Sequence, residues 1–224
     1  MNVPRTFGVS LARVSQSMTD DHATADPVDQ QISHLFALVA EALSGATDAL
    51  LSGNIRAGQA VVDRDRAIDD LTADVVRQVW ARLDSGTTTR NELHHLVGLL
   101  LILPELERSA DLAEHIAQRA VSNLGAEMSP SSRGIVQRMT EVALEMWRTA
   151  ADAYADRTAQ GVALDEDDEE MDLLHQRLTR EISAEAMPTP VAAQLTLVAR
   201  FYERLGDHAV NLAHRIGGFA SLDP

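Results

Sequence analysis

The pattern of apolar and polar positions changes near residue 27. From there to the C-terminus, apolar residues recur every three or four positions, which is the period of an amphipathic helix, and short turn signals interrupt them. Residues 1–26 do not continue this pattern, so we expect a flexible N-terminal tail. The pattern predicts six helices, at residues 28–53, 57–86, 89–125, 133–161, 163–188 and 189–219.

The six predicted helices form two sets of three. A shift of 96 residues places the third helix on the sixth, with Glu107 on Glu203 and Asp111 on Asp207. The apolar positions of the two helices superpose under the same shift. We therefore predict an all-α protein that contains an internal repeat. Its two tandem three-helix bundles would occupy residues 27–128 and 129–224.

Acidic residues recur in pairs on these helices, each pair being an acid, three intervening residues and an aspartate. Side chains four positions apart share one face of a helix, where two acids repel by roughly 0.2–0.5 kcal/mol. The arrangement nevertheless occurs four times, twice in each predicted bundle. The pairs are Asp65 with Asp69, Glu107 with Asp111, Asp168 with Asp172, and Glu203 with Asp207.

The second and third predicted helices would form an antiparallel hairpin, and so would the fifth and sixth. Each hairpin would bring its two acid pairs to the same height along the helix axes. The midpoint between the first two pairs is Thr88, beside the turn at Ser85-Gly86, and the midpoint between the other two is Met187-Pro188. In the last helix the acids lie opposite the apolar seam, which places them on the surface or in a shallow groove. Four oxygen ligands at one level suit a hard or borderline cation, that is magnesium, calcium, manganese or iron. We expect the bound metal to be iron, manganese, zinc or magnesium. Ordinary solvated acids are the alternative.

Composition and charge restrict the class of protein further. The net charge of −15 disfavours binding to nucleic acid or to an anionic membrane. The absence of cysteine excludes disulfides and thiolate metal sites. No apolar run has the length of a signal peptide or a membrane span, so we expect a cytoplasmic protein without membrane insertion. The chain shows no phosphate-binding glycine loop and no nucleophile motif, so we expect no enzyme activity.

The charged motifs resemble those of a known family. The stretches YERLGDHAVNLAHRI and LERSADLAEHIAQRA are similar to the Glu-Arg-x-x-Asp signature of the PhoU family, and DRDRAIDD and DEDDEEMDLLHQRL look like its partner motif. The resemblance covers roughly residues 28–219 and implies two three-helix bundles related by pseudo-twofold symmetry. It also implies that the four acid pairs hold metal ions or clusters.

The resemblance implies a function as well. PhoU proteins are negative regulators of the phosphate-starvation response, and they link the ATPase of a phosphate ABC transporter to a sensor histidine kinase. They commonly form oligomers, so a homodimer is expected. Two other functions stay open from the sequence alone. One is a carboxylate-bridged dimetal enzyme, for which Glu92 and His95 have a suitable spacing, and the other is a bare helical scaffold.

The first half departs from the family pattern around its signature. Ser109 and Ala110 stand where the second half has Leu205 and Gly206. Pro104 lies one turn before the first signature glutamate. Because proline removes a helical hydrogen bond and bends a helix, we expect the first metal site to be the weaker one.

Overall fold

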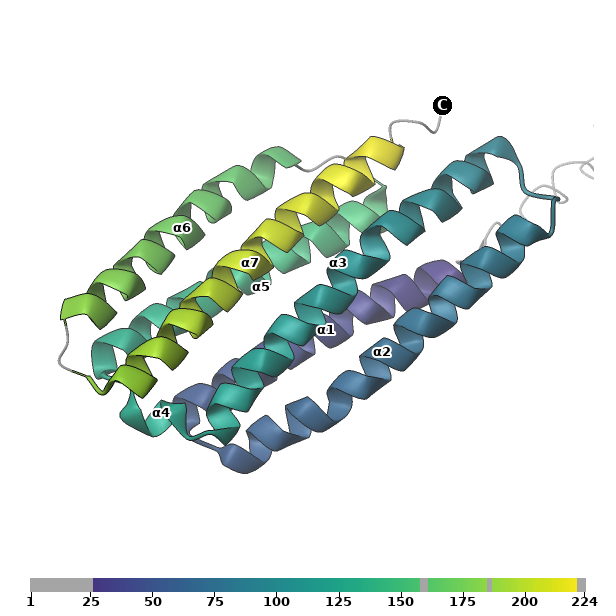
Figure 1. The fold of residues 1–224 in the computed structure, drawn as a ribbon. Helices are drawn as coiled ribbons and strands as arrows, with labels where there is room; N and C mark the ends of the chain where they lie inside the picture. The colour runs from purple at the N-terminus through teal and green to yellow at the C-terminus, as the bar shows by residue number, and fades with distance from the viewer. Residues whose placement is uncertain (1–25, 158–160, 185–186, 221–224) are drawn as a thin grey trace, which may run out of the picture.

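The computed structural model describes residues 26–157, 161–184 and 187–220, which form helices and the short connections between them (Figure 1). The predicted tail at residues 1–26 lies outside the described residues except for Asp26, which caps the first helix. The helices are α1 (Pro27–Ser52), α2 (Ile55–Asp84), α3 (Arg90–Val121), α4 (Leu124–Glu127), α5 (Pro130–Asp156), α6 (Gly161–Ala184) and α7 (Thr189–Ala220).

The helices form two three-helix bundles that lie side by side. The helices α1, α2 and α3 pack against one another, as do α5, α6 and α7, and the two groups meet where α3 contacts α7 and α1 contacts α5. Figure 1 shows α2 and α6 at the two outer edges. This arrangement confirms the predicted all-α architecture with an internal repeat. The described residues contain seven helices rather than six, because the connection between the bundles includes the one-turn helix α4.

The ends of the helices follow from local turn chemistry. Gly53 has a φ of 67°, a left-handed conformation that favours glycine, and its N–H donates back to the last turn of α1. Ser129 accepts a hydrogen bond from the first turn of α5, so the predicted boundary between residues 128 and 129 coincides with a helix cap. The prediction that the fourth helix continues to Gly161 was wrong. The helix α5 ends at Asp156, because Arg157 adopts a left-handed conformation, and Gly161 begins α6.

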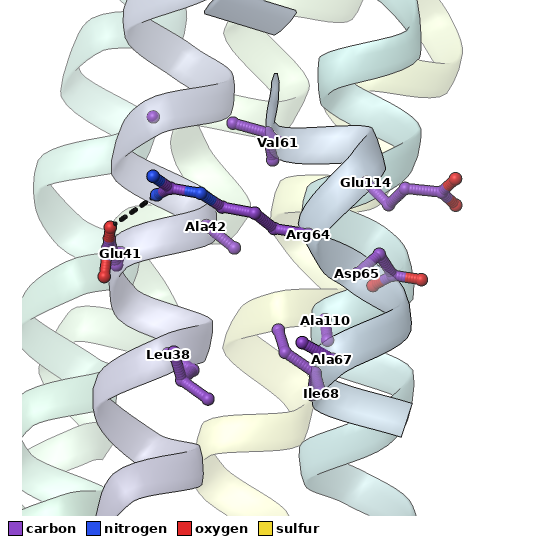
Figure 2. Close-up of a pocket in the computed structure, with 11 residues that line it drawn as sticks. Leu38, Glu41, Ala42, Val61, Arg64, Asp65, Ala67, Ile68, Ala110 and Glu114 are labelled. Atoms are coloured by element: carbon purple, nitrogen blue, oxygen red, sulfur yellow. Dashed lines mark hydrogen bonds and ion pairs between the residues drawn. The ribbon is translucent and has the colours of Figure 1, made fainter. Parts of the chain in front are cut away.

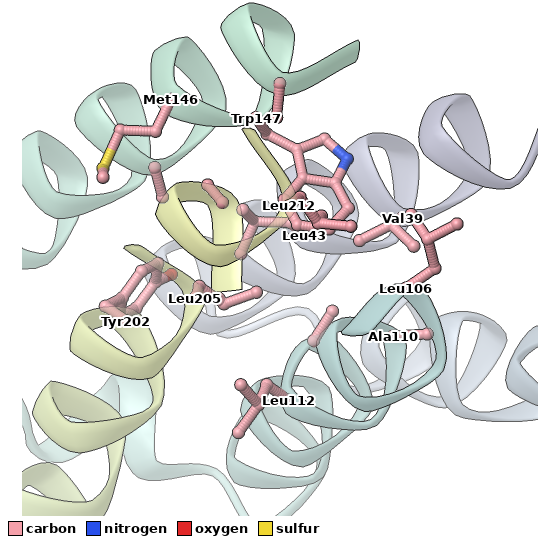
Figure 3. Packing of buried hydrophobic residues seen from close by; sticks show 14 of the residues in the cluster. Val39, Leu43, Leu106, Ala110, Leu112, Met146, Trp147, Tyr202, Leu205 and Leu212 are labelled. Atoms are coloured by element: carbon pink, nitrogen blue, oxygen red, sulfur yellow. The ribbon is translucent and has the colours of Figure 1, made fainter. Parts of the chain in front are cut away.

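One hydrophobic core runs through both bundles. Trp147 of α5 is buried in it, and its indole N–H donates to the carbonyl of Phe36 on α1 over 3.0 Å. The ring centroids of Phe36 and Trp147 lie 5.7 Å apart. Figure 3 shows Trp147 beside Leu43 of α1 and Leu212 of α7. Side chains from both halves of the chain therefore pack in the same layer.

A buried polar cluster lies where α3 meets α7. Glu105 accepts a hydrogen bond from Arg215 over 3.1 Å, and the hydroxyl of Ser109 lies 3.0 Å from Nδ1 of His208. Glu105, Ser109 and His208 are all buried. Ser109, which departs from the expected signature, therefore belongs to the contact between the two halves and lies away from the acid pairs.

Among the described helices, α1 is long and apolar enough to cross a membrane by length and composition. Its apolar residues Ile32, Leu35 and Val39 are buried against the other helices. The core helix of a globular domain passes the same test, so α1 gives no argument for a membrane span.

Candidate metal centre

Three predicted ligands meet where α2 packs against α3. Asp65 and Asp69 lie one turn apart on α2, and Asp111 lies on α3. One carboxylate oxygen from each lies within 4.8 Å of the other two. Oxygens that share one cation at about 2.0–2.4 Å are separated by at most about 4.8 Å, so this trio fits a single ion. The donor set is oxygen alone, which suits magnesium, manganese or iron.

The carboxylates of the trio repel one another in the absence of a cation. The pKa of Asp65 is raised to about 6, first by burial and then by the charges of Asp69, Glu114 and Asp111. The pKa of Asp111 is raised as well, by burial and by the charge of Asp69. A cation among these oxygens would replace the repulsion with attraction, so the electrostatics favour an ion here.

The fourth predicted ligand of the first half is placed differently from the other three. Glu107 is exposed and lies outside the trio, although its charge also raises the pKa of Asp65. Glu114, which was not predicted, raises the pKa of both Asp65 and Asp111 and so faces the same cluster. The spacing of Glu107, Asp111 and Glu114 is that of one helix face. This stripe was the signal that could have identified Glu114.

The first half was expected to hold the weaker site because of Pro104. This proline lies inside α3, which continues without interruption to Val121. The trio of the first half is also the one group of three acids this close together in the part of the chain that the structure describes. The relative affinity of the two sites stays a prediction, but the geometry gives no reason for the first site to be the weaker.

The four predicted ligands of the second half influence one another electrostatically across α6 and α7, although among the described residues no three of them are as close together as the trio. The pKa of Asp168 is raised by burial and then by the charges of Asp172 and Asp207. The pKa of Glu203 is raised by burial and by Asp207, while Arg200 opposes the shift. Arg200 also forms an ion pair with Glu203 on the same helix. A cation that binds Glu203 would therefore have to displace this arginine.

His175 is a nitrogen donor beside the second cluster. It lies three residues after Asp172 on α6, and its charge lowers the pKa of Glu203. A shift of 103 residues superposes α2 on α6 and gives Thr72 this position in the first half. The second cluster therefore offers oxygen and nitrogen donors, which suit zinc or iron, whereas the trio offers oxygen alone.

Without metal, the stability of the protein should depend on pH through Asp65. The folded-state pKa of about 6 is above the ordinary value of 3.8, so the folded protein binds this proton more tightly than the unfolded chain does. The metal-free protein should therefore lose stability as the pH rises from about 4 to about 6. Because Asp65 is partly solvated, we expect this loss to be about 1 kcal/mol, below the full linkage value.

Thermal unfolding in the presence of a chelator measures this effect. Asp65→Asn should remove this loss of stability. The variant should therefore melt about 2–4 °C above the parent near pH 7 and at nearly the same temperature as the parent near pH 4. Asp63→Asn changes an exposed acid on the same helix and serves as the matched control. An equal advantage for both variants would show that general charge, and not the trio, determines the pH dependence.

The comparisons with known proteins concern the family and the fold of the chain. The chain matches the PhoU domain twice, at residues 32–120 and 136–216. A relative from Aquifex aeolicus, named phosphate-specific transport system accessory protein PhoU homolog, is 32% identical over 181 residues, which cover 78% of this chain and 81% of the relative. A relative of the same name from Rhizobium meliloti is 26% identical over 192 residues, covering 84% and 81%.

Solved structures share the fold. The crystal structure of PhoU from Pseudomonas aeruginosa has a TM-score of 0.79 at 22% identity and covers 87% of this chain and 95% of its own. The phosphate transport system regulatory protein PhoU from Streptococcus pneumoniae has a TM-score of 0.78 at 20% identity, covering 88% and 94%. Both likenesses show the same arrangement of two helical bundles.

Proposed function

Since the chain belongs to the PhoU domain family, we propose that it regulates phosphate uptake and the phosphate-starvation response. In detail, we propose a non-catalytic, metal-binding adaptor that acts as a negative regulator between a phosphate ABC transporter ATPase and a sensor histidine kinase. It would work in the cytoplasm and as a homodimer. Relatives that are named as accessory proteins of the phosphate-specific transport system support the role in phosphate transport.

The trio Asp65, Asp69 and Asp111 is the observation that carries the metal-binding part of the proposal. Its oxygens are close enough to share one ion. The pKa values of Asp65 and Asp111 are raised by burial and by repulsion from neighbouring acids. A bare scaffold gives no reason for acids to gather at matching places in both halves, whereas a cation does.

The alternative of a dimetal enzyme has less support. It requires carboxylates that line a buried cavity, whereas Asp69, Asp172 and Asp207 are exposed. The histidine of the Glu-x-x-His motif, His95, lies 2.9 Å from Asp29 on α1 and so has a structural partner. The geometry therefore supports a binding role more than a catalytic one.

An adaptor acts by binding a partner in one signalling state of that partner. Arg108 and Arg204 occupy equivalent positions beside the acid pairs, and both are exposed on a protein whose net charge is −15. A guanidinium suits recognition of a partner carboxylate, so these two arginines are the proposed contacts.

Co-purification from phosphate-replete and phosphate-starved cells tests the proposed function. The transporter ATPase and the sensor kinase should be recovered with the tagged protein in amounts that depend on phosphate. Arg204→Glu should reduce their recovery several-fold, while Arg180→Glu, which makes the same charge change at an exposed position of α6, should not. Absence of both partners under both conditions would contradict the adaptor role.

A further inference from the structure

A pocket with a volume of about 440 Å³ opens between α1 and α2 (Figure 2). This volume is in the range that proteins use to bind ligands. Arg64 of α2 reaches across the pocket to Glu41 of α1, with 2.9 Å between the charged atoms. Most of the other lining side chains are small or apolar, among them Leu38, Ala42, Val61, Ala67, Ile68 and Ala110.

Asp65 and Glu114 also line the pocket. Figure 2 shows their carboxylates pointing away from Leu38 and Glu41. An occupant of the pocket would therefore contact mainly apolar atoms and would leave the candidate metal ligands accessible from the α3 side.

The equivalent surface of the second half, between α5 and α6, is charged rather than apolar. The shift of 103 residues places Leu38 on Glu141 and Ala67 on Glu170. Between α5 and α6, Arg138 donates to Glu170 over 2.7 Å and to Glu141 over 3.2 Å, so ion pairs span the equivalent surface. The second copy of the repeat thus folds with charged side chains at these positions. The apolar pocket is a separate property of the first half.

The sequence before Asp26 contains an apolar stretch without acids. Residues 1–19 read MNVPRTFGVSLARVSQSMT, with two arginines, in a chain whose net charge is −15. An isolated helix of this length is marginal in water, so a tail of this kind would become helical only when bound to a surface. A helix binds an apolar groove through residues three and four positions apart. The stretch lacks the continuous pattern seen after residue 27, but four of its larger apolar residues have this spacing, namely Phe7, Leu11, Val14 and Met18.

This stretch is long enough to reach the pocket in the same molecule. The pocket begins at Leu38, twelve residues after Asp26 and therefore about 18 Å along α1. With residues 11–18 helical and the eight residues from Met18 to Asp26 extended, Leu11 can lie up to about 35 Å from Asp26. A contact within one chain also has an effective concentration of roughly millimolar, so a weak individual affinity is sufficient.

The charges of the pocket and of the stretch are complementary. Residues 41–48 of α1 and 56–70 of α2 contain six acids and three arginines, a difference of −3. One of these arginines, Arg64, is already paired with Glu41. Arg13 lies between Leu11 and Val14, so it would be near the excess negative charge when those two residues enter the pocket.

We propose that residues 4–18 bind back onto their own chain, with Leu11 and Val14 in the pocket between α1 and α2. Arg13 then lies among the acids around the pocket. The bound segment covers this apolar surface against other partners, and it does so in the first half alone. The contact goes beyond the proposed regulatory function and does not depend on it.

Cross-linking between introduced cysteines tests this contact, because the chain has no cysteine of its own. In the full-length protein, a short bismaleimide should join Leu11→Cys to Ala67→Cys roughly tenfold faster than it joins Leu11→Cys to Ala73→Cys. Ala73 is exposed on the same helix. The pairing of Gln78 with Gln31 shows that this part of α2 lies nearer the start of α1. The N-terminal segment is attached at the start of α1, so simple proximity would favour cross-linking to Ala73→Cys over cross-linking to Ala67→Cys.

A substitution inside the pocket separates specific binding from simple proximity. Ala42→Leu fills part of the pocket and should lower the L11C/A67C rate to that of the L11C/A73C control, with the far-ultraviolet circular dichroism unchanged. Three results would overturn the proposal. They are equal rates for the two pairs, a rate that Ala42→Leu does not change, and cross-links that form only between two molecules.

Discussion

Replacing Asp65, Asp69 and Asp111 together with asparagine is expected to abolish cation binding in the first half of the protein. The three oxygens that fit one ion are then neutral amide oxygens, and the loss of three anionic ligands should weaken binding by more than about 100-fold. Because the substitution also removes a cluster of repelling charges, the metal-free variant should be at least as stable as the metal-free parent.

Calorimetric titration with Mn²⁺ and thermal unfolding measure the two parts of this result. The matched control replaces Asp70, Asp74 and Asp84, three exposed acids of the same helix, with asparagine. It makes the same change in net charge and should keep the affinity of the parent. An equal loss of affinity in both variants would mean that the ions bind through general negative charge.

Deleting the gene is expected to switch on phosphate-starvation genes in phosphate-rich medium. A negative regulator without catalytic groups acts only by stabilising one state of its partner, so its removal frees that partner. Coupling free energies of this kind correspond to changes on the order of tenfold, and a reporter for a phosphate-starvation promoter measures them.

Complementation makes the deletion result specific. The parent gene should restore repression, and so should the Arg180→Glu variant, while Arg204→Glu should restore it only in part. An unchanged response to phosphate in the deletion strain, in a genome without a second gene of this family, would remove the regulatory function. The prediction of a metal-binding helical protein would then stand alone.

The long helices and the internal repeat could be predicted because each helix buries one apolar face. The residues Ile32, Leu35 and Val39 are three and four positions apart, and all three are buried in α1. The helix α4, Leu124–Glu127, could not be predicted in this way, because four residues are too short to show a period.

The contacts between the two halves depend on residues far apart in the chain. Glu105 follows the apolar run LLLILP, and its burial is explained mainly by partners on α7, namely Arg215, 110 residues later, and His208. The hydroxyl of Tyr202 lies 2.5 Å from that of Thr47 and 3.0 Å from that of Thr140, on two other helices. No local pattern predicts such partners, because periodicity identifies the buried face of a helix and not the helix that covers it.

The acid pairs of the candidate site could be predicted, since both the spacing within a helix and the level across a hairpin follow from local geometry. The choice between Glu107 and Glu114 could not. Both belong to the same stripe as Asp111, and the side of the stripe that faces the neighbouring helix depends on how α2 packs against α3. Tertiary packing, and not spacing, determines which acids lie close enough together to share an ion.

The most direct test of the metal-binding account is the anomalous scattering of manganese in crystals of this protein grown with Mn²⁺. The account predicts a peak between α2 and α3, with one oxygen each from Asp65, Asp69 and Asp111 at about 2.0–2.4 Å from the ion. It predicts a second peak between α6 and α7. Crystals in which the helices keep the arrangement of Figure 1 but no ordered manganese lies at either acid cluster would contradict it.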